Sequence, residues 1–104
     1  MKNLIKIIVL LFVVNTVNAQ IVTIPDANFK ARLLAADVTN YIAYDLNDYP
    51  IKIDANNNYE IEASEVLLVK TLNISQSSII DLTGIEYFNN LISLFLIFKS
   101  KFVN

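Results

Sequence analysis

Residues Asp54–Glu65 carry the side chains with the clearest potential for chemistry, in the order DANNNYEIEASE. Oxygen-bearing side chains stand at positions 1, 3, 5, 9 and 12 of this stretch: Asp54, Asn56, Asn58, Glu62 and Glu65. The backbone carbonyl of Glu60 falls at position 7. Ca²⁺ requires about six to eight oxygen ligands that converge from a short segment, and this spacing can supply them. The stretch therefore predicts a calcium site with these six residues as ligands.

The same stretch resembles the calcium loop of EF-hand proteins, with Ile61 at the apolar position 8. Two features depart from that family. Position 6, normally a glycine, is Tyr59, for which a left-handed conformation costs about 1–2 kcal/mol. The segment before the loop contains Pro50 where EF-hands have a helix. An asparagine-rich surface turn that caps a short helix from Ala63 to Leu68 explains the same residues, so both interpretations stay open.

Apolar residues recur with a fixed spacing in the second half of the chain. A triplet returns after 22 residues: Val69, Leu72 and Ile74, then Leu91, Leu94 and Leu96. Four further apolar residues lie between the two copies: Ile79, Leu82, Ile85 and Phe88. This pattern predicts two parallel strands, at residues 69–74 and 91–97, joined by an arc whose apolar side chains point inward.

Because successive side chains of a strand point to opposite faces, the residues between the apolar ones share the outer face of this sheet. They are Thr71, Asn73, Ser93 and Phe95. We predict that these four side chains form the surface that contacts a partner.

The spacing L-x-x-L-x-L resembles the leucine-rich repeat. Three stretches make the chain resemble exported, internalin-like leucine-rich-repeat proteins of the Bacteroidetes type: residues 24–30, which open a cap, the acidic loop 54–65, and residues 80–91 inside the repeat. The resemblance implies an α/β fold with about one and a half solenoid coils at residues 69–96, behind an N-terminal cap at residues 20–68. It also implies a non-enzymatic protein of the cell surface or medium that binds a protein or a glycan.

The N-terminus has the pattern of a secretory signal peptide. Lys2 and Lys6 precede the apolar run 7–14, and small or short residues lead to Ala19. A run of this length is too short for a membrane-spanning helix, which needs about 20 residues. We expect cleavage after Ala19 and an extracellular or cell-surface location, with a membrane anchor as the alternative.

Composition excludes several classes of function. The chain has no histidine, no cysteine and a single glycine, so the usual nucleophile–base pairs, disulfides and glycine-rich phosphate loops cannot be built. Without residues 1–19, six basic residues would face ten acidic ones, a net charge of −4. This balance argues against nucleic acid as a partner. We predict that the protein is not an enzyme.

Two further expectations concern local structure and the end of the chain. Apolar spacing after Asp26 predicts an amphipathic helix from Asp26 to Ala36, then a connection at residues 37–49 and a short strand at residues 51–53. The repeat pattern fails at Lys99 and Lys101, so residues 97–104 form an irregular tail. We expect residues 91–98 to be an exposed edge strand of a truncated repeat protein or fragment.

Overall fold

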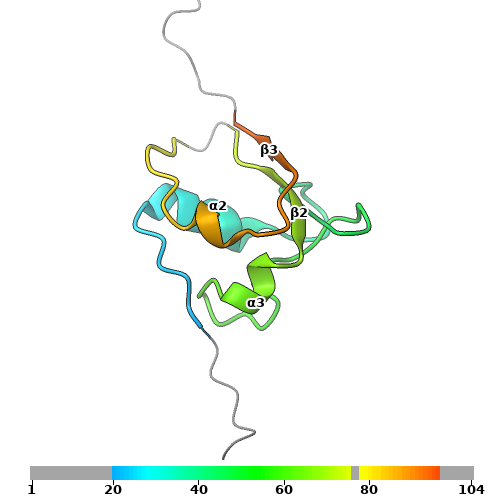
Figure 1. Cartoon of the computed structure of the whole chain (residues 1–104), viewed down its shortest axis with the longest axis horizontal. Helices are drawn as coiled ribbons and strands as arrows, with labels where there is room; N and C mark the ends of the chain where they lie inside the picture. The colour runs from blue at the N-terminus through cyan, green and yellow to red at the C-terminus, as the bar shows by residue number, and fades with distance from the viewer. Residues whose placement is uncertain (1–19, 76–77, 97–104) are drawn as a thin grey trace, which may run out of the picture.

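Three short strands form one mixed sheet in the computed structural model, which describes residues 20–75 and 78–96 (Figure 1). The strands are β1 (Ala43–Asp45), β2 (Val69–Asn73) and β3 (Ser93–Phe95), in the order β1-β2-β3. Two α-helices and a 3₁₀ helix complete the fold, which confirms the α/β class. A repeat solenoid is not seen in the described residues. The predicted signal peptide and tail lie outside them.

The predicted parallel strand pair is confirmed. β2 and β3 run parallel, with Leu72 opposite Leu94 and Asn73 opposite Phe95. The backbone N–H of Ile74 donates to the carbonyl of Phe95 at 3.0 Å. β3 is shorter than the predicted strand 91–97, whose last residue is not described. The 22-residue recurrence therefore corresponds to side-by-side positions in space, as the spacing requires.

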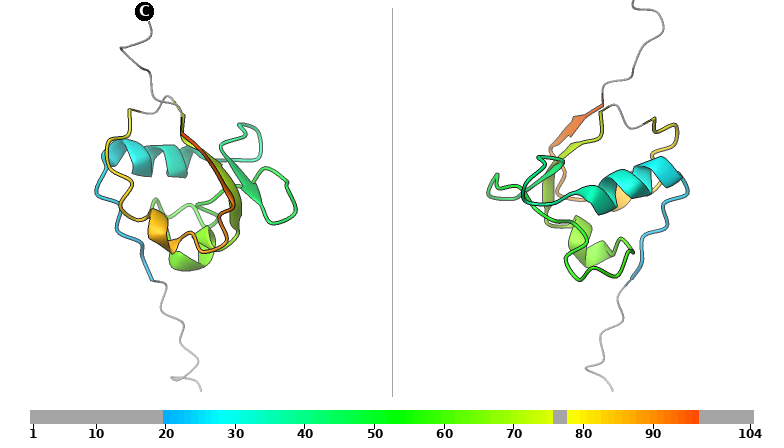
Figure 2. Two further views of the ribbon diagram at one scale, coloured as in Figure 1. Left: turned by 45° about the horizontal axis from the view of Figure 1, so that its top comes forward. Right: turned by 180° about the vertical axis from the view of Figure 1, so that it is seen from behind.

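The segment between these strands returns along an arc (Figure 2). Ile79 and Phe88 are buried in the core, and Leu82 and Ile85 pack against it. Near its end the arc contains the 3₁₀ helix η1 (Ile85–Tyr87). Gly84 precedes η1 with a φ of 108°, a conformation that other residues rarely adopt. The predicted inward orientation of the four arc residues is confirmed.

Helix α2 (Ala27–Ala35) lies beside the arc, close to the predicted bounds (Figure 2). Its N-cap is Asp26, whose Oδ1 accepts a hydrogen bond from the backbone N–H of Phe29 at 2.9 Å. Phe29 and Leu33, four residues apart, are completely buried. The capping residue and the apolar face thus explain both the start of this helix and its packing.

Asp26 also joins the helix to the arc. Its second carboxylate oxygen, Oδ2, accepts hydrogen bonds from the backbone N–H groups of Ile80 at 2.9 Å and Asp81 at 3.0 Å. These bonds hold the pKa of Asp26 below its usual value, with the bond from Ile80 as the largest cause. One side chain therefore connects two elements that are more than 50 residues apart in the chain.

Three local predictions need correction. Residues 51–53 do not form a strand, because the pairing of this segment with β1 is limited to the isolated bridge between Tyr44 and Pro50 and to the bond from the N–H of Ile51 to the carbonyl of Ala43. Instead, β1 lies within the segment 37–49, which was predicted as a connection, and pairs antiparallel with β2. Helix α3 spans only Ala63–Val66, and the chain turns at the next two residues, which the prediction had included in the helix.

Within residues 20–75 and 78–96, no helix combines the length and the apolar character needed to cross a bilayer.

Candidate functional site

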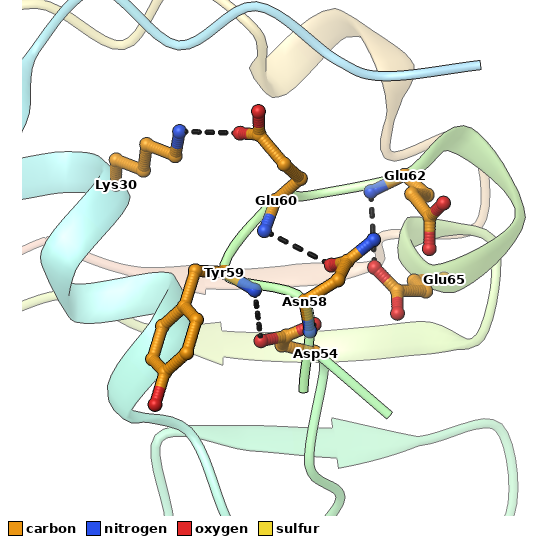
Figure 3. A network of polar contacts seen from close by, with 7 residues as sticks. All are labelled: Lys30, Asp54, Asn58, Tyr59, Glu60, Glu62 and Glu65. Carbon is orange, nitrogen blue, oxygen red and sulfur yellow. Dashed lines mark hydrogen bonds and ion pairs between the residues drawn. The ribbon is translucent and has the colours of Figure 1, made fainter. Parts of the chain in front are cut away.

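The acidic loop at residues 54–65 is ordered by its own side chains (Figure 3). The carboxylate of Asp54 accepts hydrogen bonds from the backbone N–H groups of Asn58 at 3.3 Å and Tyr59 at 3.0 Å. Oδ1 of Asn56 accepts from the N–H of Asn58 at 3.2 Å, and Oδ1 of Asn58 accepts from the N–H of Glu60 at 3.0 Å. Short polar side chains thereby satisfy the backbone of a sharply turning segment.

Two residues of this loop have left-handed backbone conformations. Tyr59, at the position that is a glycine in EF-hand loops, has a φ of 63°, and Asn57 has a φ of 57°. Residue 59 thus has the left-handed conformation that an EF-hand loop has at this position. Asparagine tolerates this conformation well, whereas a bulky side chain is strained in it. The turn therefore keeps its left-handed conformation at position 59, although the residue there is tyrosine and not the glycine that favours it.

Buried carboxylates connect the loop to helix α3. Glu65 accepts hydrogen bonds from the backbone N–H of Glu62 at 3.0 Å and from that of Ala55 at 3.1 Å, so it caps the helix and fixes the loop. Burial is the main reason why the pKa of Glu65 is raised, and the negative charges of Glu62 and Asp54 raise it further. The loop thus concentrates negative charge in a place where water screens it poorly.

The six predicted calcium ligands lie in one loop but do not form a metal-binding group there. Among the residues that the structure describes, no three acidic side chains are arranged so that they could hold a metal ion. The side chain of Glu60 points to α2, where its Oε1 lies 2.6 Å from Nζ of Lys30 (Figure 3). Nδ2 of Asn56 donates to Oε1 of Glu62 at 2.7 Å. In this arrangement the side chains of Glu60, Asn56 and Glu62 bond to other groups of the protein, and calcium binding stays a prediction.

The predicted contact residues of the sheet do lie together. Thr71 is paired with Ser93, and Asn73 with Phe95, so the four side chains form a two-by-two array on one side of β2 and β3. The neighbouring Leu72 points into the core and is fully buried. Phe95 is 53 % exposed, and the other three are half-buried. We call these four residues the sheet face.

Two tyrosines of the segment 37–49, which the sequence favours as half-buried packing residues over a ligand platform, extend the sheet face. Tyr44 of β1 is the register partner of Thr71, so its side chain lies on the same side of the sheet. The ring of Tyr41 stacks on that of Tyr44, with 6.4 Å between centroids and 24° between planes. We call these two residues the tyrosine platform. Only the pairing of β1 with β2 reveals it, because no local sequence pattern predicts that strand.

Comparison of the chain with protein-family models, with curated protein sequences and with solved structures found no significant match in any of the three.

Proposed function

We propose that this chain is a secreted or cell-surface, non-enzymatic module of the leucine-rich-repeat type, which binds a protein or glycan partner through the sheet face. The supporting observation is the register of β2 and β3, which places the four outward residues of the recurring pattern side by side. Their side chains offer hydroxyl, amide and aromatic groups, the chemistry of a recognition surface. The signal-peptide pattern up to Ala19 supports export.

A binding comparison tests this proposal. The purified protein is labelled and applied to whole cells and to extracellular extracts, beside a double variant in which Asn73 and Phe95 are replaced by alanine. Val38→Ala serves as the matched control, because Val38 is exposed on the connection after α2 and not on the sheet face. We expect the double variant to lose binding and the control to retain it. Equal binding by all three proteins would remove the sheet face as the contact surface.

A second candidate function is a calcium-stabilised cap. The observation that favours it is the mutual repulsion within the acidic loop, where Glu62 and Asp54 raise the pKa of the buried Glu65. A divalent cation would relieve this repulsion, but the loop oxygens would first have to turn away from their backbone partners. Calorimetric titration with Ca²⁺, with Glu65→Ala as control, separates the alternatives. No heat, or heat that the substitution leaves unchanged, would leave the self-capped turn as the explanation.

A further inference from the structure

We propose that the tyrosine platform and the adjoining sheet face bind a short, neutral oligosaccharide. This inference rests on the proposed function of the sheet face and names the class of its ligand. Three features of the described residues carry it: the aromatic stack, the absence of net charge on the surface, and the small size of the sheet.

The tyrosine platform has the chemistry to hold a sugar ring. Tyr41 is 61 % exposed although its ring stacks on Tyr44, so much of its surface remains open to solvent. Aromatic rings pack against the C–H faces of pyranose sugars, and tyrosine adds a hydroxyl at the edge of the ring. Beside the platform, Thr71 and Ser93 supply hydroxyls and Asn73 supplies an amide, which can bond to sugar hydroxyls.

Tyr41 combines an exposed ring with a strained backbone. Tyr41 has a φ of 60°, a left-handed conformation that is unfavourable for a bulky residue. An exposed aromatic side chain adds no packing to the core that could offset the strain of its backbone, and backbone outliers of this kind cluster at binding sites. Tyr59 is equally strained and exposed, but only Tyr41 also stacks on a residue of the sheet, so the combination of strain, stacking and position favours a role of Tyr41 in recognition.

The charge on this surface favours a neutral ligand. None of the four residues of the sheet face and neither tyrosine of the platform is basic or acidic. The two basic side chains nearest these residues already have partners: Nζ of Lys70 in β2 lies 2.9 Å from Oδ1 of Asp48, and Nε of Arg32 donates to the carbonyl of Asn73 at 3.2 Å. The six side chains of the sheet face and the tyrosine platform therefore offer no opposite charge of their own to an acidic polysaccharide or a strongly basic peptide.

The size of the sheet favours a short ligand. With strands about 4.8 Å apart and about 3.3 Å per residue, three strands and the five residues of β2 define a face of roughly 10 Å by 17 Å. That is under about 200 Å², whereas a standard protein interface buries about 800 Å² on each partner. A short oligosaccharide fits this area, and a folded protein partner would need surface beyond it.

An NMR titration with a matched pair of variants tests the inference. The probes are the neutral trisaccharides maltotriose, cellotriose, mannotriose and chitotriose, with acidic trigalacturonate for comparison. Tyr41→Gly removes the ring and relieves the left-handed strain, so this variant is expected to unfold at a temperature no lower than that of the parent. Tyr59→Gly makes the same change at an equally strained, exposed tyrosine of the acidic loop.

We expect at least one neutral trisaccharide to shift the amide signals of β1 and β2, and Tyr41→Gly to weaken its binding by about tenfold. Tyr59→Gly should bind as the parent does. The inference is overturned if no neutral trisaccharide shifts these signals, if trigalacturonate binds more tightly, or if Tyr41→Gly binds unchanged. In each case, loss of cell binding by the Asn73 and Phe95 double variant would still uphold the sheet face as a contact surface.

Discussion

Replacing Tyr59 by glycine should stabilise the protein. Tyr59 occupies a left-handed conformation with a φ of 63°, which costs a residue with a Cβ about 1–2 kcal/mol. Glycine removes this cost but adds about 0.4–1 kcal/mol of conformational entropy to the unfolded chain. Tyr59 is 75 % exposed, which is close to the exposure of a tyrosine in a partly compact unfolded chain. Removing its side chain therefore costs little packing. The free energy of unfolding should therefore rise by about 0.5–1 kcal/mol.

For a domain of this size, a change of 1 kcal/mol moves the midpoint of thermal unfolding by roughly 4–8 °C. We therefore expect Tyr59→Gly to raise it by about 2–8 °C, measured by circular dichroism and checked by urea denaturation. The backbone N–H of residue 59, which donates to Oδ2 of Asp54 at 3.0 Å, is retained in this variant.

Asn57→Gly is the matched control. Asn57 has nearly the same φ, 57°, but asparagine tolerates it, so glycine should bring no gain there and a small entropic loss. If both variants lose stability by the same amount, the left-handed conformation of Tyr59 carries no strain. The argument for the strain at Tyr41, which has the same basis, would then fail as well.

Three further predictions concern other parts of the molecule. Gly84→Ala should destabilise the protein by more than about 1 kcal/mol in urea denaturation, because a Cβ at a φ of 108° is strained and would lie 3.0 Å from Cγ1 of Ile24. The pKa of Asp26 is lowered in the folded protein, so its carboxylate stabilises the fold above the ordinary pKa of 3.8, and this stabilisation is lost as the pH falls through the folded pKa. Asp26→Asn should therefore lower the thermal midpoint at pH 7 and make that midpoint fall less steeply as the pH is lowered. Ile92→Lys, at a 75 % exposed position just before β3, should reduce self-association in sedimentation velocity, because charge protects an open strand edge.

Features that depend on neighbouring residues could be predicted from the sequence. The start of α2 follows from Asp26 and from the spacing of Phe29 and Leu33, all within two helical turns. The pairing of β2 with β3 is a long-range contact, but the 22-residue recurrence predicts it, because each outward residue of β2 lies opposite the residue 22 positions later in β3. The positive φ at Tyr59 matches the position at which the EF-hand resemblance requires a left-handed residue.

Features that depend on distant partners could not be predicted. β1 has only three residues and alternates tyrosine with alanine and aspartate, so its strand conformation comes from pairing with β2. The bonds from Ile80 and Asp81 to Asp26 join segments that share no sequence pattern. For the same reason the sequence favours packing over a ligand platform for Tyr41 and Tyr44, since their place on the sheet depends on the register between β1 and β2.

The two edges of the sheet differ in what lies beside them. β1 covers one edge of β2 with an antiparallel strand, while β3 forms the other edge among the described residues. Exposed apolar surface gathers at that second edge, beside an open hollow of about 570 Å³ lined by Ile79, Ile80, Asp81, Leu82 and Leu96. Residues 49–51 bond to the outer side of β1, so among the described residues β3 is the edge at which a further coil or another strand can extend the sheet. Because Tyr44 belongs to β1 and Tyr41 stacks on it, such an addition would extend the sheet face and leave the proposed sugar site uncovered.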